Sequence, residues 1–140
     1  MLYRVHEILL IASPYDSYIL EEDGRLTEQI LGEYIGMNLS YAPRLWNAAS
    51  ANDAIEMLDN RSFDLIIIML RISDMNPITL SKKIKEQYPE KPIILLAFDE
   101  SELEHIPQNY KQTIDNIFIW SGNSNVFPAI IKYVEDKENV

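Results

Sequence analysis

Three short apolar runs organise the chain. They cover residues 8–11, 65–70 and 93–98, and each is rich in branched side chains and bounded by polar residues or proline. Continuous apolarity without alternation is typical of strands that are covered on both faces, as in a parallel sheet. Weaker apolar segments predict two further strands over residues 45–49 and 116–120.

Apolar residues at helical spacing follow each predicted strand. The stripes cover residues 26–34, 54–58, 80–88, 100–110 and 127–134, and the fourth is the weakest because Pro107 interrupts it. Strands that alternate with helices in this way predict a doubly wound α/β fold with helices on both faces of a parallel sheet. Residues 14–24, which separate the first strand from the first strong stripe, predict an unusually long loop.

Composition narrows the classes of function. The 140 residues suit one domain spanning 1–140, and the formal net charge of -10 argues against binding to nucleic acid or to an anionic membrane surface. The chain has no cysteine, which excludes disulfides and thiolate metal sites. No signal peptide or membrane-spanning run is visible, so a cytoplasmic location is expected. His6 and His105 have no second ligand at metal-binding spacing in the sequence, and the sequence contains no glycine-rich phosphate loop. No cofactor or metal is therefore predicted.

The segment FDLIIIMLRISDMNP, residues 63–77, resembles the third strand and following loop of the receiver domain of bacterial response regulators. The segments ILLIAS (8–13), KPIILLAF (91–98) and NIFIW (116–120) extend this resemblance over nearly the whole chain. It implies a flavodoxin-like, three-layer fold whose five-stranded parallel sheet has the order 2-1-3-4-5.

Receivers carry phosphoryl chemistry on a few residues at the ends of the strands. An acidic pair and a phosphoacceptor Asp hold Mg²⁺, and a Ser or Thr and a Lys stabilise charge on the phosphoryl group. By the resemblance, the acidic pair falls here on Ala12 and Ser13, and the phosphoacceptor Asp falls on Met69. The Ser or Thr position falls on Ala97 and the Lys position on Trp120. Because none of the five residues can do the chemistry of its position, the sequence predicts a pseudo-receiver: a non-enzymatic regulatory domain that acts by protein contact.

Two alternative functions remain open. A displaced Asp, Asp74 or Asp16, would make the domain a working phosphoacceptor, whereas a pocket left by the lost residues would make it a small-ligand sensor. The acidic segment around Asp16 is interpreted as a solvated loop, and Asp74 and Asp99 lack partner carboxylates in the sequence pattern. Trp120 is expected to fill the site against Met69, since apolar strand ends would hold water poorly.

A second resemblance concerns the wider protein. The segments ILLIASPYDSYILEEDGRL, NLSYAP, IFIWSGN and AIIKYVED are similar to the N-terminal receiver-like segment of bacterial proteins that continue into a catalytic region of the phosphoenolpyruvate synthase and pyruvate phosphate dikinase type. This implies that the chain is the N-terminal module of a longer protein. The expected partner is another protein, the later domains of the same chain or a second copy forming a homodimer. The predicted interface includes Tyr110, Ile130 and Tyr133.

Overall fold

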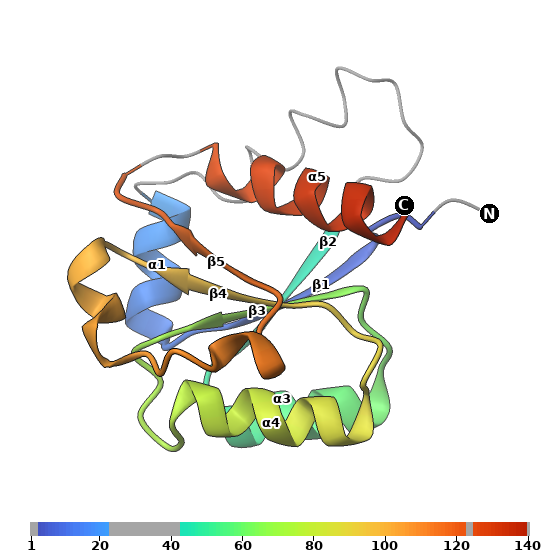
Figure 1. Cartoon of the computed structure of the whole chain (residues 1–140), viewed down its shortest axis with the longest axis horizontal. Coiled ribbons are helices and arrows are strands. Elements are labelled where there is room, and N and C mark those ends of the chain that lie inside the picture. Colours follow the sequence, from blue (N-terminus) through green and yellow to red (C-terminus); the bar gives the residue numbers. More distant parts are fainter. Residues whose placement is uncertain (1–2, 23–42, 123–124, 140) are drawn as a thin grey trace.

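The structure is a computed structural model that describes residues 3–22, 43–122 and 125–139. Five parallel strands form one sheet in the order β2-β1-β3-β4-β5 (Figure 1). This confirms the predicted fold and strand order, and each strand lies within one residue of its predicted position. The strands are β1 (Glu7–Ile11), β2 (Arg44–Ala48), β3 (Leu65–Met69), β4 (Ile93–Ala97) and β5 (Asn116–Ile119).

Helices cover both faces of the sheet. In Figure 1, α3 and α4 lie on one face and α5 lies on the other, where α1 also packs. The helices are α1 (Pro14–Glu22), α3 (Ala51–Asn60), α4 (Pro77–Gln87) and α5 (Val126–Glu138), together with two short 3-10 helices, η1 (Glu100–His105) and η2 (Tyr110–Gln112). None of the described helices is long and apolar enough to cross a membrane.

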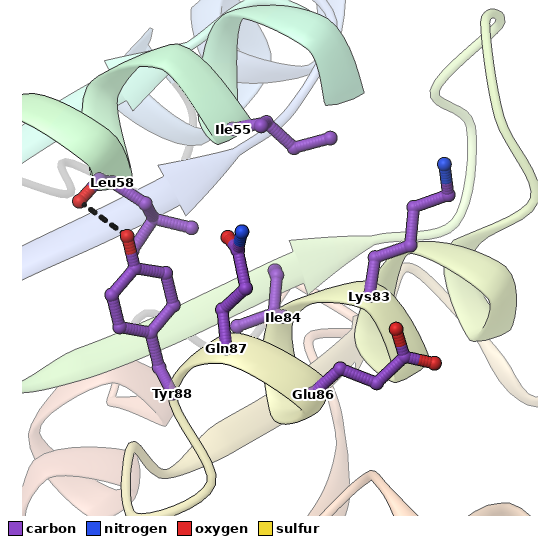
Figure 2. A pocket seen from close by; sticks show the side chains of 7 residues that line it. All are labelled: Ile55, Leu58, Lys83, Ile84, Glu86, Gln87 and Tyr88. Carbon is purple, nitrogen blue, oxygen red and sulfur yellow. Dashed lines mark hydrogen bonds between the residues drawn. The ribbon is translucent and has the colours of Figure 1, made fainter.

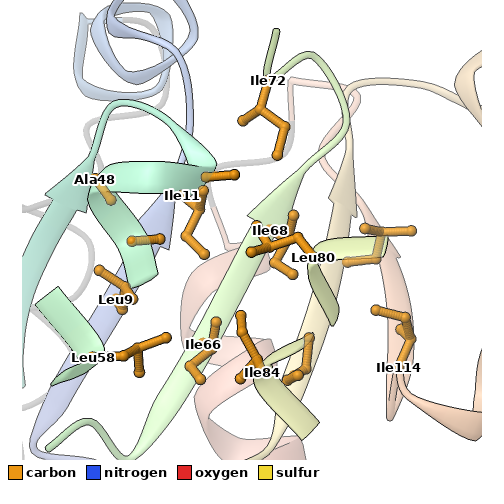
Figure 3. Close-up of a cluster of buried hydrophobic side chains, with 14 of the residues drawn as sticks. Leu9, Ile11, Ala48, Leu58, Ile66, Ile68, Ile72, Leu80, Ile84 and Ile114 are labelled. Carbon is orange, nitrogen blue, oxygen red and sulfur yellow. The ribbon is translucent and has the colours of Figure 1, made fainter. Parts of the chain in front are cut away.

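The central strands supply the core. Every residue of β3 and β4 is buried, and their side chains alternate between the two faces. Leu65, Ile67 and Met69 pack with α1 and α5, whereas Ile66 and Ile68 pack with α3 and α4 (Figure 3). Burial on both faces explains why these strands read as continuous apolar runs.

One prediction about the loops was wrong, because residues 14–22 form helix α1 and not a long loop. The Ser13 hydroxyl accepts a hydrogen bond from the amide of Asp16 at 3.2 Å, and Pro14 occupies the first turn. A capping Ser followed by Pro is a helix start signal. Helix α1 buries only Asp16 and Leu20, so it lacks the broad apolar stripe of the other helices. The stripe predicted at 26–34 lies outside the described residues.

The fourth predicted helix, over residues 100–110, was also wrong. The segment forms η1 and η2 on either side of Pro107, which has no backbone amide to donate within a helix. The carboxylate of Asp99 begins η1 by accepting a hydrogen bond from the Ser101 amide at 2.9 Å. Two short 3-10 helices therefore stand where a longer helix was expected.

A partly exposed ion-pair cluster joins several elements at the amino edge of the sheet. Asp115, just before β5, accepts hydrogen bonds from Lys137 of α5 at 2.8 Å, Lys85 of α4 at 3.2 Å and the Ile93 amide of β4 at 2.7 Å. Burial on its own raises the pKa of Asp115, but the contacts with Lys137, the Ile93 amide and Lys85 outweigh burial and lower this pKa below its usual value.

Replacing Asp115 should reduce stability in a pH-dependent manner. Because the pKa of Asp115 is lower in the folded state, its contribution is complete above about pH 4 and is lost as the pH falls through the folded pKa. We expect Asp115→Asn to lower the free energy of unfolding by about 2 kcal/mol at pH 7 and by less at pH 3. Urea unfolding at both pH values measures this difference.

The matched control is Asp136→Asn, which removes an exposed carboxylate that pairs with Lys132 at 3.8 Å within α5. Exposed pairs of this kind contribute little, so the control should behave like the parent protein. An equal effect of both substitutions would contradict the assigned role of Asp115.

Candidate functional site

The carboxyl ends of all five strands meet at one edge of the sheet, where doubly wound folds place their sites. Backbone hydrogen bonds continue the sheet here, from the Ala12 amide to Ala48 at 3.1 Å and from the Trp120 amide to Ala97 at 2.8 Å. Met69 ends β3, between the ends of β1 and β4. The structure therefore brings Ala12, Ser13, Met69, Ala97 and Trp120 to the same edge.

Three buried residues form an apolar surface at this edge, which we call the floor: Ala12, Met69 and Ala97. Ala12, Met69 and Ala97 are at most 1% exposed, and none offers a carboxylate or hydroxyl. Ser13 does have a hydroxyl, but it caps α1. Within residues 3–22, 43–122 and 125–139, no group of three His, Cys, Asp or Glu side chains is arranged to hold a metal ion. The side chains of Ala12, Met69 and Ala97 therefore offer no oxygen atom at this edge.

Two aromatic side chains lie at this edge. Trp120 and Phe98 are half-buried and pack against the core cluster that contains Met69 and Ala12. Their ring centroids are 5.5 Å apart in an edge-to-face arrangement, a favourable geometry for aromatic pairs. That Trp120 fills the site against Met69 stays a prediction. The Trp120 Nε1 is buried and donates to no acceptor in the described part of the chain. Sequence reasoning missed Phe98, which directly follows β4.

Asp16 and Arg71 form an ion pair at this edge, which the sequence analysis did not predict. The Arg71 guanidinium donates to both carboxylate oxygens of Asp16, at 2.8 and 3.2 Å. The prediction that Asp16 lies in a solvated loop was wrong, because the first turn of α1 holds it against the sheet and leaves it only 2% exposed. The spacing Ser13-Pro14-x-Asp16, a helix start with an acid in its first turn, was the available signal.

The other candidate carboxylates cap helices. Asp74 accepts hydrogen bonds from the amides of Ala51 and Asn52 at the start of α3, at 2.9 and 3.0 Å, and these bonds lower the pKa of Asp74. Asp99 accepts from the hydroxyl and the amide of Ser101, and the hydroxyl contact is the main cause of the lowered pKa of Asp99. Both carboxylates thus stabilise a helix start.

The predicted interface residues differ in exposure. Tyr110 and Tyr133 are half-buried, and the Tyr133 ring lies 5.7 Å from that of Phe118. Ile130 is fully buried in the core between α5 and the sheet, so its side chain cannot contact a partner of the folded domain. The interface itself stays a prediction.

A cavity of about 260 Å³ lies between α3 and α4 (Figure 2). Tyr88 closes one side of it by donating a hydrogen bond to the carbonyl of Leu58 at 3.0 Å. None of its lining residues belongs to the carboxyl edge of the sheet. They are Ile55, Leu58, Lys83, Ile84, Glu86, Gln87 and Tyr88.

Comparison with known proteins agrees with this geometry. The family model of the response regulator receiver domain matches residues 19–119. The chain belongs to this family. Receiver domains are in general not enzymes, and they function in two-component signalling. Met69 and Ala97 lie inside the matched range, whereas Ala12, Ser13 and Trp120 lie outside it.

Individual relatives of this receiver domain are distant. The DNA-binding transcriptional regulator NtrC of Proteus hauseri is 36% identical over 62 residues, which are 44% of this chain and 13% of that protein. The signal receiver domain of an HD domain-containing protein from Pseudomonas fluorescens Pf-5 has 21% identity and a TM-score of 0.69, with 96% of this chain and 98% of that chain covered. A receiver domain protein from Clostridium thermocellum has 15% identity and a TM-score of 0.71, with 95% and 96% covered. These structures show the fold alone.

Trp120 should tolerate loss of its ring nitrogen better than loss of its ring. Trp120→Phe removes a buried donor that has no acceptor in the described residues, so we expect a change in unfolding free energy below about 1 kcal/mol. Trp120→Ala removes the edge-to-face contact with Phe98 and should cost about 3 kcal/mol. Chemical denaturation of both variants measures the difference, and equal costs would show that the ring does not stabilise this edge.

Proposed function

We propose that this receiver domain is a pseudo-receiver, a regulatory domain that acts by contact with a protein and takes up no phosphoryl group. The observation that carries the proposal is the apolar floor of the carboxyl edge. A phosphoacceptor must be a nucleophilic carboxylate, and Mg²⁺ requires hard oxygen ligands. Met69 at the end of β3 has a thioether, which neither accepts a phosphoryl group nor binds Mg²⁺ well.

The neighbouring positions support the same function. Ala97 ends β4 with a methyl group where a receiver needs a hydroxyl, and Ala12 follows β1 where it needs a carboxylate. Trp120 follows β5 and presents a neutral ring in place of an ammonium group. Charge that developed on a transferred phosphoryl group would therefore meet no cation from these positions.

A working phosphoacceptor at a displaced Asp is the second candidate function. Asp16 lies at this edge, but both of its carboxylate oxygens accept hydrogen bonds from Arg71. Asp74 is exposed, yet both of its oxygens accept backbone hydrogen bonds at the start of α3. Phosphorylation of either would break these contacts, which favours the pseudo-receiver.

A small-ligand sensor is a weaker candidate still, because Trp120 and Phe98 pack at the carboxyl edge.

The proposed partner is a protein surface, either the later domains of a longer chain, a second copy or a separate protein. The resemblance to the N-terminal segment of phosphoenolpyruvate synthase-like proteins supports the first of these. The half-buried tyrosines Tyr110 and Tyr133 are proposed to contribute to the contact, since aromatic side chains with a polar end are common at interfaces. The formal net charge of -10 disfavours nucleic acid as the partner.

Acetyl phosphate provides a direct test of this function. We expect the domain, incubated with acetyl phosphate and Mg²⁺, to show no mass increase of a phosphoryl group in intact-mass spectrometry. A receiver domain that retains its acidic pair and phosphoacceptor Asp serves as the positive control. A stable, Mg²⁺-dependent adduct on any Asp of this domain would refute the proposal.

Restoring one acid should not restore phosphorylation. Met69→Asp would bury a carboxylate among apolar side chains, which should lower the free energy of unfolding by about 1–3 kcal/mol. Met69→Leu conserves volume and polarity, so it should cost less than about 1.5 kcal/mol. Thermal unfolding and the acetyl phosphate response measure both effects. If Met69→Asp is as stable as the parent and takes up phosphate readily, a phosphorylation site is still largely intact.

A further inference from the structure

Arg71 lies where three segments of the chain meet, each following a different strand. Its guanidinium contacts Asp16 of α1 and reaches Glu102 of η1, with 3.7 Å between Arg71 Nε and Glu102 Oε2. Arg71 itself belongs to the loop between β3 and α4. We name Asp16, Arg71 and Glu102 together the Arg71 bridge.

The bridge also contacts the aromatic pair. The Arg71 Cζ lies 4.3 Å from the centre of the Phe98 ring, within the range of a cation–π contact. The Phe98 amide donates to the other carboxylate oxygen of Glu102 at 2.5 Å. One guanidinium is therefore linked to the segments that follow β1, β3 and β4, and through Phe98 to Trp120 after β5.

The two side chains of the Asp16–Arg71 ion pair differ in burial. The Asp16 side chain is 3% exposed, whereas that of Arg71 is 51% exposed. A buried carboxylate needs its partner to compensate for lost hydration. Removing one member of such a pair therefore lowers the free energy of unfolding far more than losing a surface salt bridge does. Two parallel N–H···O bonds also fix the orientation of the guanidinium, which a lysine could not do.

We propose that the Arg71 bridge is an internal latch, which holds α1, the β3–α4 loop and η1 in one arrangement. The latch deepens the proposed function and rests on it, because a domain that takes up no phosphoryl group has no phosphoryl contact to position these segments. The Arg71 guanidinium joins α1, the β3–α4 loop and η1 at the carboxyl edge. Since the Asp16 carboxylate is buried, moderate salt should not open the latch.

Amide hydrogen exchange tests the latch in the intact chain. In Arg71→Ala, we expect amides at the start of α1, such as Ser17, and in η1, such as Glu102, to exchange at least about tenfold faster than in the parent protein. Amides of β3 report global unfolding and should change less. Raising the salt concentration to about 0.5 M should leave the exchange of the parent unchanged.

The matched control is Arg61→Ala. Arg61 also places its guanidinium over an aromatic ring, with 3.9 Å from Cζ to the centre of Trp46, but this contact lies beside β2, away from the bridge. The control should leave exchange in α1 and η1 as in the parent. Arg71→Lys, which retains the charge but not the two parallel bonds, should give an intermediate increase.

Three results would overturn the latch. The first is that amides of α1 or of η1 exchange no faster in Arg71→Ala than in the parent. The second is that amides of β3 show the same increase in exchange as those of α1 and η1. The third is that Arg61→Ala speeds exchange in α1 and η1 as much as Arg71→Ala does. If Arg71→Ala does not fold, the double variant Arg71→Ala with Asp16→Asn provides the test, because a neutral amide removes the unpaired buried charge. The double variant should fold and still show fast exchange in η1. A phosphoryl adduct would refute the proposed function, whereas unchanged exchange in Arg71→Ala would refute only the latch.

Discussion

Burial of the central strands on both faces is the constraint on which the structure depends. Parallel strands with helices on each side must carry apolar residues throughout, as β3 and β4 do. The same parallel direction brings every carboxyl end to one edge. Residues far apart in the sequence, such as Ala12 and Trp120, therefore lie at the same edge because of the sheet and not because of any local motif.

The two edges of the sheet hold charge in different ways. At the amino edge, Asp115 is surrounded by Lys85, Lys137 and a backbone amide, so helices α4 and α5 are tied to the strands. At the carboxyl edge, the strand ends are apolar and the only acid buried beside them among the described residues, Asp16, is neutralised by Arg71. Asp16 is buried and Asp115 is partly exposed, and both carboxylates join elements that the sheet alone would leave separate.

The apolar carboxyl edge is the basis of our proposal that this receiver domain acts by contact. Phosphoryl chemistry requires charged groups that are accessible and free to bind a ligand. Here the charged groups near the edge bind one another or cap helices, as Asp74 does for α3. Met69, Phe98 and Trp120 contribute apolar packing to this edge.

The sequence by itself determined the strands and the doubly wound α/β class, because these follow from local apolar patterns. The sheet order was implied by the resemblance to receiver domains, and the structure confirms it. Helix α1 escaped prediction because its first turn buries an acid in place of an apolar residue. Ile130 was assigned to a surface, although its position on α5 directs it into the core. The pair of Asp16 and Arg71, separated by 55 positions, was decided only by the tertiary structure, since neither residue has a local partner and the fold alone brings α1 over the end of β3.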